Sequence, residues 1–180
     1  PADTAGKAIG VVTIAGEIVD GDAGPGVAGG ERIAGLLDAK LDEDYAALVV
    51  RVDSPGGSVI ASERIRDAIE RYVEREIPVV VSMGNLAASG GYWVSMPAKR
   101  IFAEPATITG SIGVFAVVPT FERALADLGI TGDGVKTTPL SGQPDPLFGL
   151  TPEVEQITQS YVDANYTRFV DLVSKSRGVA

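Results

Sequence analysis

The sequence AALVVRVDSPGGS, residues 46–58, is the stretch that decides the fold. Its first seven residues are an apolar, β-branched run typical of a buried strand, and the run ends at Asp53. After the two glycines, residues 60–73 predict an amphipathic helix, with apolar side chains on one side and charged ones on the other. The apolar side is predicted to consist of Ile60, Ile65, Ile69, Tyr72 and Val73. A strand that leads through a glycine turn into a helix indicates an α/β fold.

Other segments repeat the alternation of strands and helices. Apolar runs at residues 8–14 and 78–82 predict two further strands, and residues 30–41 carry apolar side chains at helical spacing. Residues 83–88 are predicted to turn into a short helix that begins near Ser89. Continuous apolar strands of this kind indicate a largely parallel sheet that is covered by helices.

The second half of the chain is less regular. Residues 100–103 and 112–118 are predicted to form short strands, with a turn at residues 109–111 between them. Residues 120–128 have a helical pattern that a glycine stops. Residues 137–149 are rich in Pro and Gly and show no periodicity, which predicts a loop.

A long helix is predicted near the C-terminal end. Thr151 suits the N-cap, Pro152 suits the first helical position, and two glutamates lie in the first turn. The residues predicted to face inward are Val154, Ile157, Tyr161, Ala164, Phe169 and Val173.

These elements together predict one domain over residues 1–180. We expect its core at residues 8–136, a loop at residues 137–150 and the C-terminal helix at residues 151–178. The domain is expected to be shortened at both ends.

The composition restricts the chemistry. The net charge of −9 and the lack of clustered Lys and Arg argue against a nucleic-acid partner. The chain has neither Cys nor His, which excludes thiolate zinc sites, a cysteine nucleophile, a Ser-His-Asp triad and His metal ligands. We therefore expect no metal and no cofactor, and any proton transfer must use a carboxylate, Lys, Tyr, a terminus or water. No apolar run approaches the roughly 20 residues that a membrane span requires.

Three glycine clusters each follow an apolar strand. They are SPGGS at residues 54–58, ASGGYW at residues 88–93 and TGSIG at residues 109–113. Loops that leave the carboxyl ends of parallel strands are where sites form in α/β proteins. None of the clusters continues into Gly-Lys-Ser/Thr, which argues against a P-loop.

The middle cluster contains a candidate nucleophile. Ser89 is predicted to start a helix and is followed by two glycines, a layout in which the Gly90 amide can donate to an oxyanion. Gly56 or Gly57 could supply the second donor. The same letters also suit a tight turn and an ordinary helix cap, so the residues alone leave both interpretations open.

Taken together, the motifs resemble the protease IV or signal peptide peptidase A family, which are serine peptidases of the ClpP/crotonase-like fold. The stretches that carry the resemblance are VDSPGGSVIASERIR (52–66), VVVSMGNLAASGGYW (79–93), TITGSIGVF (107–115) and TPEVEQITQSYVDANYTRFVDLVSKSRG (151–178). The resemblance implies that Ser89 is the nucleophile, that the amides of Gly57 and Gly90 form the oxyanion hole, and that Ser111 supplies a helper hydroxyl. It also implies a lysine as the general base.

The position of that lysine is the point at which the chain departs from the short members of the family. Those members carry the lysine in the stretch that matches residues 137–149, and this chain has none there. The chain therefore resembles the C-terminal, serine-bearing half of the long two-repeat form, in which the N-terminal half provides the lysine. Lys136 is the nearest substitute. We expect the isolated chain to be nearly inactive.

The resemblance also implies the setting. The intact protein is expected to degrade hydrophobic peptides such as released signal peptides and to form a homo-oligomer. It is expected at the bacterial inner membrane, held by an N-terminal anchor, with the catalytic domain on the periplasmic or extracytoplasmic side. The alternative is a non-catalytic, crotonase-like binding or assembly module.

Overall fold

The computed structural model describes residues 6–132, 134–147 and 149–179. The chain divides into two compact units. The first contains residues 1–113 and 169–180, and the second contains residues 114–168. The single domain predicted for the whole chain stays a prediction.

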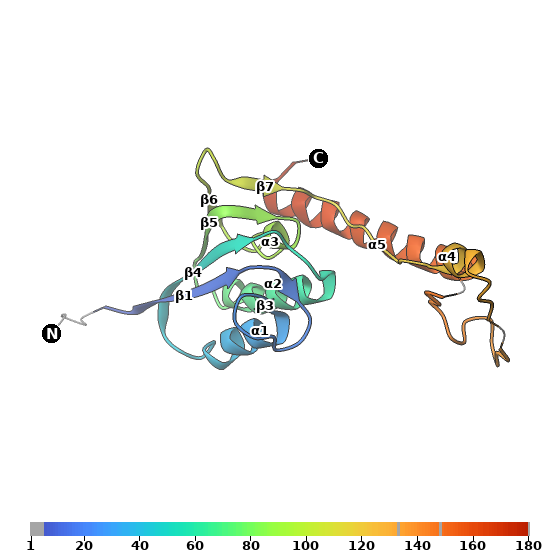
Figure 1. The fold of residues 1–180 in the computed structure, drawn as a ribbon. Helices are drawn as coiled ribbons and strands as arrows, with labels where there is room; N and C mark the ends of the chain where they lie inside the picture. Colours follow the sequence, from blue (N-terminus) through green and yellow to red (C-terminus); the bar gives the residue numbers. More distant parts are fainter. Residues whose placement is uncertain (1–5, 133, 148, 180) are drawn as a thin grey trace. The chain divides into compact units, whose positions relative to one another are not determined.

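A parallel sheet forms one layer of the first unit (Figure 1). Its strands are β1 (Ala8–Ala15), β4 (Tyr45–Ser54), β5 (Val79–Ala88), β6 (Arg100–Phe102) and β7 (Ile108–Gly110). The order is β1-β4-β5-β6, and β7 pairs with the end of β5. Two short strands, β2 (Ile18–Val19) and β3 (Ala28–Gly29), form a separate parallel pair. The predicted α/β fold with a largely parallel sheet is confirmed.

Two helices, α1 (Gly30–Ala39) and α2 (Val59–Glu74), pack against this sheet. Leu37 of α1 and Ile65 of α2 belong to one hydrophobic cluster with the strand residue Val50, and all three are almost fully buried. Burying one such side chain contributes about 1.5–3 kcal/mol, so this cluster is the main source of the unit's stability. The apolar strand and the apolar helix stripe of residues 46–73 therefore meet each other, as their patterns predict.

The strand boundaries differ from the prediction in two places. A turn was predicted at residues 83–88, but β5 continues to Ala88 because its last three residues pair with β7. The strand predicted at residues 112–118 was wrong, since none of these described residues is in a strand. The strand lies earlier, at β7, where the backbone can hydrogen-bond to β5. Pairing across the sheet, rather than the local apolar run, sets both boundaries.

The inner side of α2 also differs in detail. Ile60 and Val73, predicted to face inward, are 66% and 37% exposed. The buried positions follow i, i+4, i+7 and i+11 from Ala61 to Tyr72. At each end of the helix, the residue next to the one predicted is therefore the buried one: Ala61 instead of Ile60, and Tyr72 instead of Val73.

Helix α5 (Pro152–Arg177) belongs to both units, while α4 (Glu122–Asp127) lies in the second. The predicted N-cap is confirmed, because the Thr151 hydroxyl accepts a 3.4 Å hydrogen bond from the Val154 amide. Of the residues predicted to face inward, Phe169 is buried.

Three other residues predicted inward, Ile157, Tyr161 and Ala164, are exposed. The prediction was wrong for them because α5 packs against the hydrophobic core of the first unit only from residue 169 onward.

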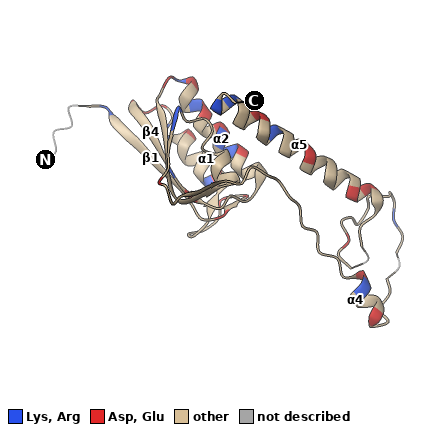
Figure 2. Cartoon of the chain, turned by 90° about the horizontal axis from the view of Figure 1, so that it is seen from above, with Lys and Arg blue, Asp and Glu red and all other residues tan. Residues whose placement is uncertain are grey.

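Positively and negatively charged residues are interspersed along α2 and α5 (Figure 2). Arg66 pairs with Glu63 at 2.9 Å, and Arg71 pairs with Asp38 at 2.6 Å. In the part of the chain that the structure describes, no helix is long and apolar enough to cross a membrane, and no group of three or more acidic side chains could hold a metal ion.

Candidate active site

Ser89 is the residue at which β5 ends and the one-turn helix α3 (Gly90–Trp93) begins. Its backbone has a φ of 51° and a ψ of −118°, a conformation that an L-residue keeps only where its surroundings impose it. One such constraint is a 2.9 Å hydrogen bond from the Ser89 amide to the carbonyl oxygen of Gly110. The half-buried side chain makes no capping hydrogen bond to α3, so Ser89 is not an ordinary helix cap.

The glycine turn after β4 lies directly beside Ser89. Gly56 and Gly57 have φ values of 97° and 148°, which favour glycine. A Cβ built on Gly56 would lie 2.9 Å from the Cβ of Ser89 and would collide with the Gly90 amide nitrogen. A Cβ built on Gly90 would lie 3.2 Å from the Gly57 nitrogen. Two glycine turns that are more than 30 residues apart in the sequence therefore touch at the predicted nucleophile.

The hydrogen bonds of this turn distinguish the two candidate donors. The Gly56 amide donates to the Ser54 hydroxyl at 3.1 Å, so it is already used. The neighbouring bonds, Ile18 to the Gly56 carbonyl and Ser58 to the Ile18 carbonyl, leave out the Gly57 amide. Within residues 6–132, 134–147 and 149–179, the Gly57 N–H has no partner, and the residue is exposed. The geometry therefore favours Gly57 over Gly56 as an oxyanion donor.

Ser111 leaves the sheet next to Ser89. Ala88 and Gly110 are opposite each other in the parallel pairing of β5 with β7, so the two serines are the next residues of adjacent strands. Ser111 also has a φ of 51° and is exposed. The structure thus brings together the backbone positions of Ser89, Gly90, Gly57 and Ser111.

The lysines of the chain differ from the buried lysine that a general base requires. Lys7 and Lys40 form exposed ion pairs with Asp44 and Glu43, at 2.6 and 2.5 Å. The hydrogen bond that Lys40 donates to Glu43 raises the pKa of Lys40, whereas a lysine that acts as a base needs a lowered pKa. Lys136 is exposed and lies in the second unit, so its predicted role as a substitute base stays a prediction.

Lys99 and Lys175 are likewise exposed. Neither residue is buried in an apolar site, which is the environment that a lysine base requires. The serine hydroxyl and the two amides are therefore present without a lysine suited to activate them in the first unit.

Two buried serines that support the site were missed from the sequence. Ser54 and Ser62 are fully buried. The Ser54 hydroxyl accepts a hydrogen bond from the Gly56 amide. The Ser62 hydroxyl donates to the Ser58 carbonyl at 2.8 Å, and it lies where a side chain on Gly90 would have to be. The quoted motif contained both residues, but their role depends on which amides meet in the fold.

Trp93, four residues after Ser89, anchors the other side of α3. Its indole N–H donates to Glu63 of α2 at 2.6 Å, and its ring packs on Phe169 of α5 with 4.5 Å between centroids. The turn that presents Ser89 is therefore attached to three elements, β7, α2 and α5.

Comparisons with known proteins agree with this geometry. The profile of peptidase family S49 matches residues 71–180. Protease 4 of Salmonella typhi is 48% identical over 178 residues, covering 98% of this chain and 28% of that protein. Protease 4 of Haemophilus influenzae is 45% identical over 170 residues, covering 94% of this chain and 28% of that protein. The chain thus spans little more than a quarter of the length of these two relatives.

Among solved structures, a ClpP1 mutant from Listeria monocytogenes superimposes with a TM-score of 0.55. The match covers 94% of this chain and 73% of that one at 16% sequence identity. At this identity the likeness establishes the fold, and it confirms the predicted ClpP-like architecture.

Proposed function

The chain belongs to peptidase family S49, and on that premise we propose that it carries the nucleophile and the oxyanion hole of a serine endopeptidase. The observation that carries the proposal is the Gly57 amide, which has no hydrogen-bond partner among the residues that the structure describes and which lies beside Gly90. Amides preorganised in this way stabilise the charge that develops on a carbonyl oxygen during acyl transfer, and each is worth about 10²–10³ in rate. The Ser89 hydroxyl attacks the peptide carbonyl to form an acyl-enzyme, which water then hydrolyses.

The base of the proposed mechanism is a lysine from a part of the full-length protein outside residues 1–180. The serine must lose its proton as it attacks, and the resemblance to signal peptide peptidase A assigns that proton to a neutral lysine amine. The pKa of that lysine has to fall from about 10.4 towards neutrality through burial. Ser111 stands beside Ser89, where its hydroxyl can orient the amine.

The proposed substrates are hydrophobic peptides, such as signal peptides left in the membrane. This substrate class, the homo-oligomer, the N-terminal anchor and the location at the extracytoplasmic side of the bacterial inner membrane follow from the resemblance to signal peptide peptidase A. The relatives named Protease 4 support peptide hydrolysis as the reaction.

A serine-directed fluorophosphonate tests the proposal on the full-length protein. We expect labelling of Ser89 in the wild type, none in Ser89→Ala, and none in the isolated chain of 180 residues. An unlabelled Ser89 in an active full-length enzyme would overturn the assignment of the nucleophile. Unchanged hydrolysis by Ser89→Ala would favour the non-catalytic binding or assembly module instead.

The isolated chain separates the two possible sources of the base. Labelling of the isolated chain that disappears in Lys136→Ala would identify Lys136 as the base and contradict a lysine from elsewhere. A matched control is Lys99→Ala, which removes another exposed lysine.

A further inference from the structure

Strand β5 contains a bulge shortly before Ser89. Val52 pairs with Met83, and the next pair is Ser54 with Ala87. The single residue Asp53 of β4 therefore faces the three residues 84–86 of β5, which we call the 84–86 bulge. Bulges of this kind bend a strand and redirect the side chains that follow, and they are frequent beside active sites.

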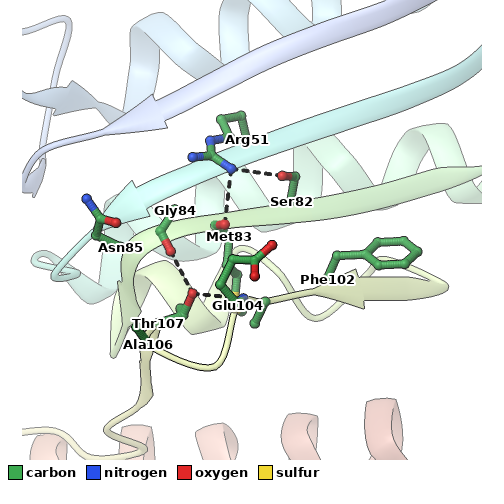
Figure 3. A pocket seen from close by; sticks show the side chains of 10 residues that line it. Arg51, Ser82, Met83, Gly84, Asn85, Phe102, Glu104, Ala106 and Thr107 are labelled. Atoms are coloured by element: carbon green, nitrogen blue, oxygen red, sulfur yellow. Dashed lines mark hydrogen bonds between the residues drawn. The ribbon is translucent and has the colours of Figure 1, made fainter.

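Two side chains form hydrogen bonds to the backbone of the 84–86 bulge. The Asp53 carboxylate accepts a 3.2 Å hydrogen bond from the Leu86 amide. Thr107, in the segment between β6 and β7, donates a 2.8 Å hydrogen bond to the carbonyl oxygen of Gly84 (Figure 3). A residue without a side chain is needed at position 84 to leave room for the carboxylate, because a Cβ built on Gly84 would lie 2.7 Å from the Asp53 Cγ.

Hydrogen bonds matter here because one side of the bulge is open. A pocket of about 370 Å³ adjoins it, lined by Met83, Gly84 and Asn85 of the strand and by Arg51 and Thr107 among others (Figure 3). Side-chain packing therefore does not fix the backbone from that direction. The bulge depends on the polar contacts that satisfy its amide and carbonyl groups.

The bulge controls how β5 reaches Ser89. From the last residue of the bulge onward, Leu86, Ala87 and Ala88 pair with β7, and the Ser89 amide then donates to the Gly110 carbonyl oxygen. The side-chain direction alternates along a strand, so a shift of one residue at the bulge would turn Ser89 to the other face of the sheet. Its unusual φ also persists only while these contacts hold.

We propose that Asp53 is a positioning residue, whose carboxylate holds the 84–86 bulge and thereby sets the place of Ser89. The proposal rests on the proposed function, in which Ser89 is the nucleophile. Asp53 acts as a hydrogen-bond acceptor, and its negative charge is not required. An asparagine oxygen can accept the same bond from Leu86, whereas alanine cannot.

The rate of fluorophosphonate labelling of the full-length protein tests this role. A displacement of about 1 Å at a reacting group can cost about 10²-fold, so we expect labelling of Asp53→Ala to be about 10- to 100-fold slower. Asp53→Asn should recover most of the rate and keep the pH dependence of the wild type. Asp44→Ala is the matched control, since it removes an exposed aspartate that pairs with Lys7. An Asn variant as slow as the Ala variant would overturn the proposal.

Gly84→Ala provides a second, independent variant. Its methyl group collides with the Asp53 carboxylate, so it should slow labelling in the wild type but add no further loss in the Asp53→Ala background. Additive losses would contradict the proposed contact.

Amide hydrogen exchange over residues 84–92 separates this inference from the function on which it rests. Faster exchange is expected in Asp53→Ala and not in Asp53→Asn, whether or not Ser89 is reactive. Unchanged exchange in Asp53→Ala overturns the positioning role. Unlabelled Ser89 in the wild type, with faster exchange in Asp53→Ala, overturns the proposed function alone.

Discussion

The amide of Ser89 donates a 2.9 Å hydrogen bond to the carbonyl oxygen of Gly110, which joins the end of β5 to the end of β7. Through this bond Ser89 and Ser111 leave the sheet as neighbours, each with a φ of 51°. Two strained serines side by side at strand ends are typical of a functional site, because such backbone strain is retained where it serves a purpose.

The Ser111 hydroxyl is expected to contribute to the rate in the full-length enzyme. One neutral hydrogen bond is worth about 0.5–1.5 kcal/mol, so Ser111→Ala should lower kcat/KM by about 3- to 10-fold. Ser111→Gly should lose the same activity while relieving the positive φ, and it should therefore unfold at a higher temperature than the alanine variant. Peptidase assays and thermal unfolding of both variants measure this. Wild-type kcat/KM in both would contradict a helper role.

Substitution of Gly57 should damage the oxyanion hole. A Cβ at this position would collide with the Ile18 carbonyl oxygen, and the φ of 148° is unfavourable for alanine. Displacing the amide should reduce kcat by about 10²–10³-fold, with a smaller change in KM.

The matched control for Gly57 is Gly35→Ala on α1. That glycine has open space around its Cβ position and an ordinary helical backbone. The Gly35→Ala variant should keep full activity, and its free energy of unfolding should rise by about 0.5–1 kcal/mol. Equal losses of kcat in the two glycine variants would show that Gly57 has no specific part in catalysis.

The contact between Trp93 and Phe169 should be visible in fluorescence, because Trp93 is the sole tryptophan of the chain. Phe169→Ala removes a fully buried ring and should lower the free energy of unfolding by about 3–5 kcal/mol. The emission of Trp93 should shift to longer wavelength as water reaches the indole. Tyr166→Ala, which truncates a ring that is 49% exposed, is the control and should change neither quantity much.

The N-terminus of α5 should show a small dependence on pH. Hydrogen bonds from its own backbone amide and from the Thr151 hydroxyl lower the pKa of Glu153. The charged form therefore stabilises the helix at pH values above the ordinary glutamate pKa, and this contribution is lost as pH falls through the lowered value. Thr151→Ala should raise the pKa of Glu153, as NMR titration of its side chain would report. An unchanged value would show that the Thr151 hydroxyl plays no part.

The local sequence was sufficient for the elements with strong periodicity. The apolar run of residues 46–52 and the helix that follows were predicted correctly, since burial of a continuous apolar surface dictates them. The absence of histidine had already excluded a Ser-His-Asp triad. The glycine clusters around Ser89 and Gly57 predicted the turns that the structure brings together at the proposed site.

Only the tertiary structure decided how these turns act together. The sequence left Gly56 and Gly57 open as donors, and the choice depends on Ser54, which occupies the Gly56 amide. The extension of β5 to Ala88 likewise depends on pairing with β7. Neither the hydroxyl that accepts from an amide two residues away nor the pairing of β5 with β7 leaves a periodic trace in the sequence, because each backbone amide is chemically the same until the fold gives it a partner.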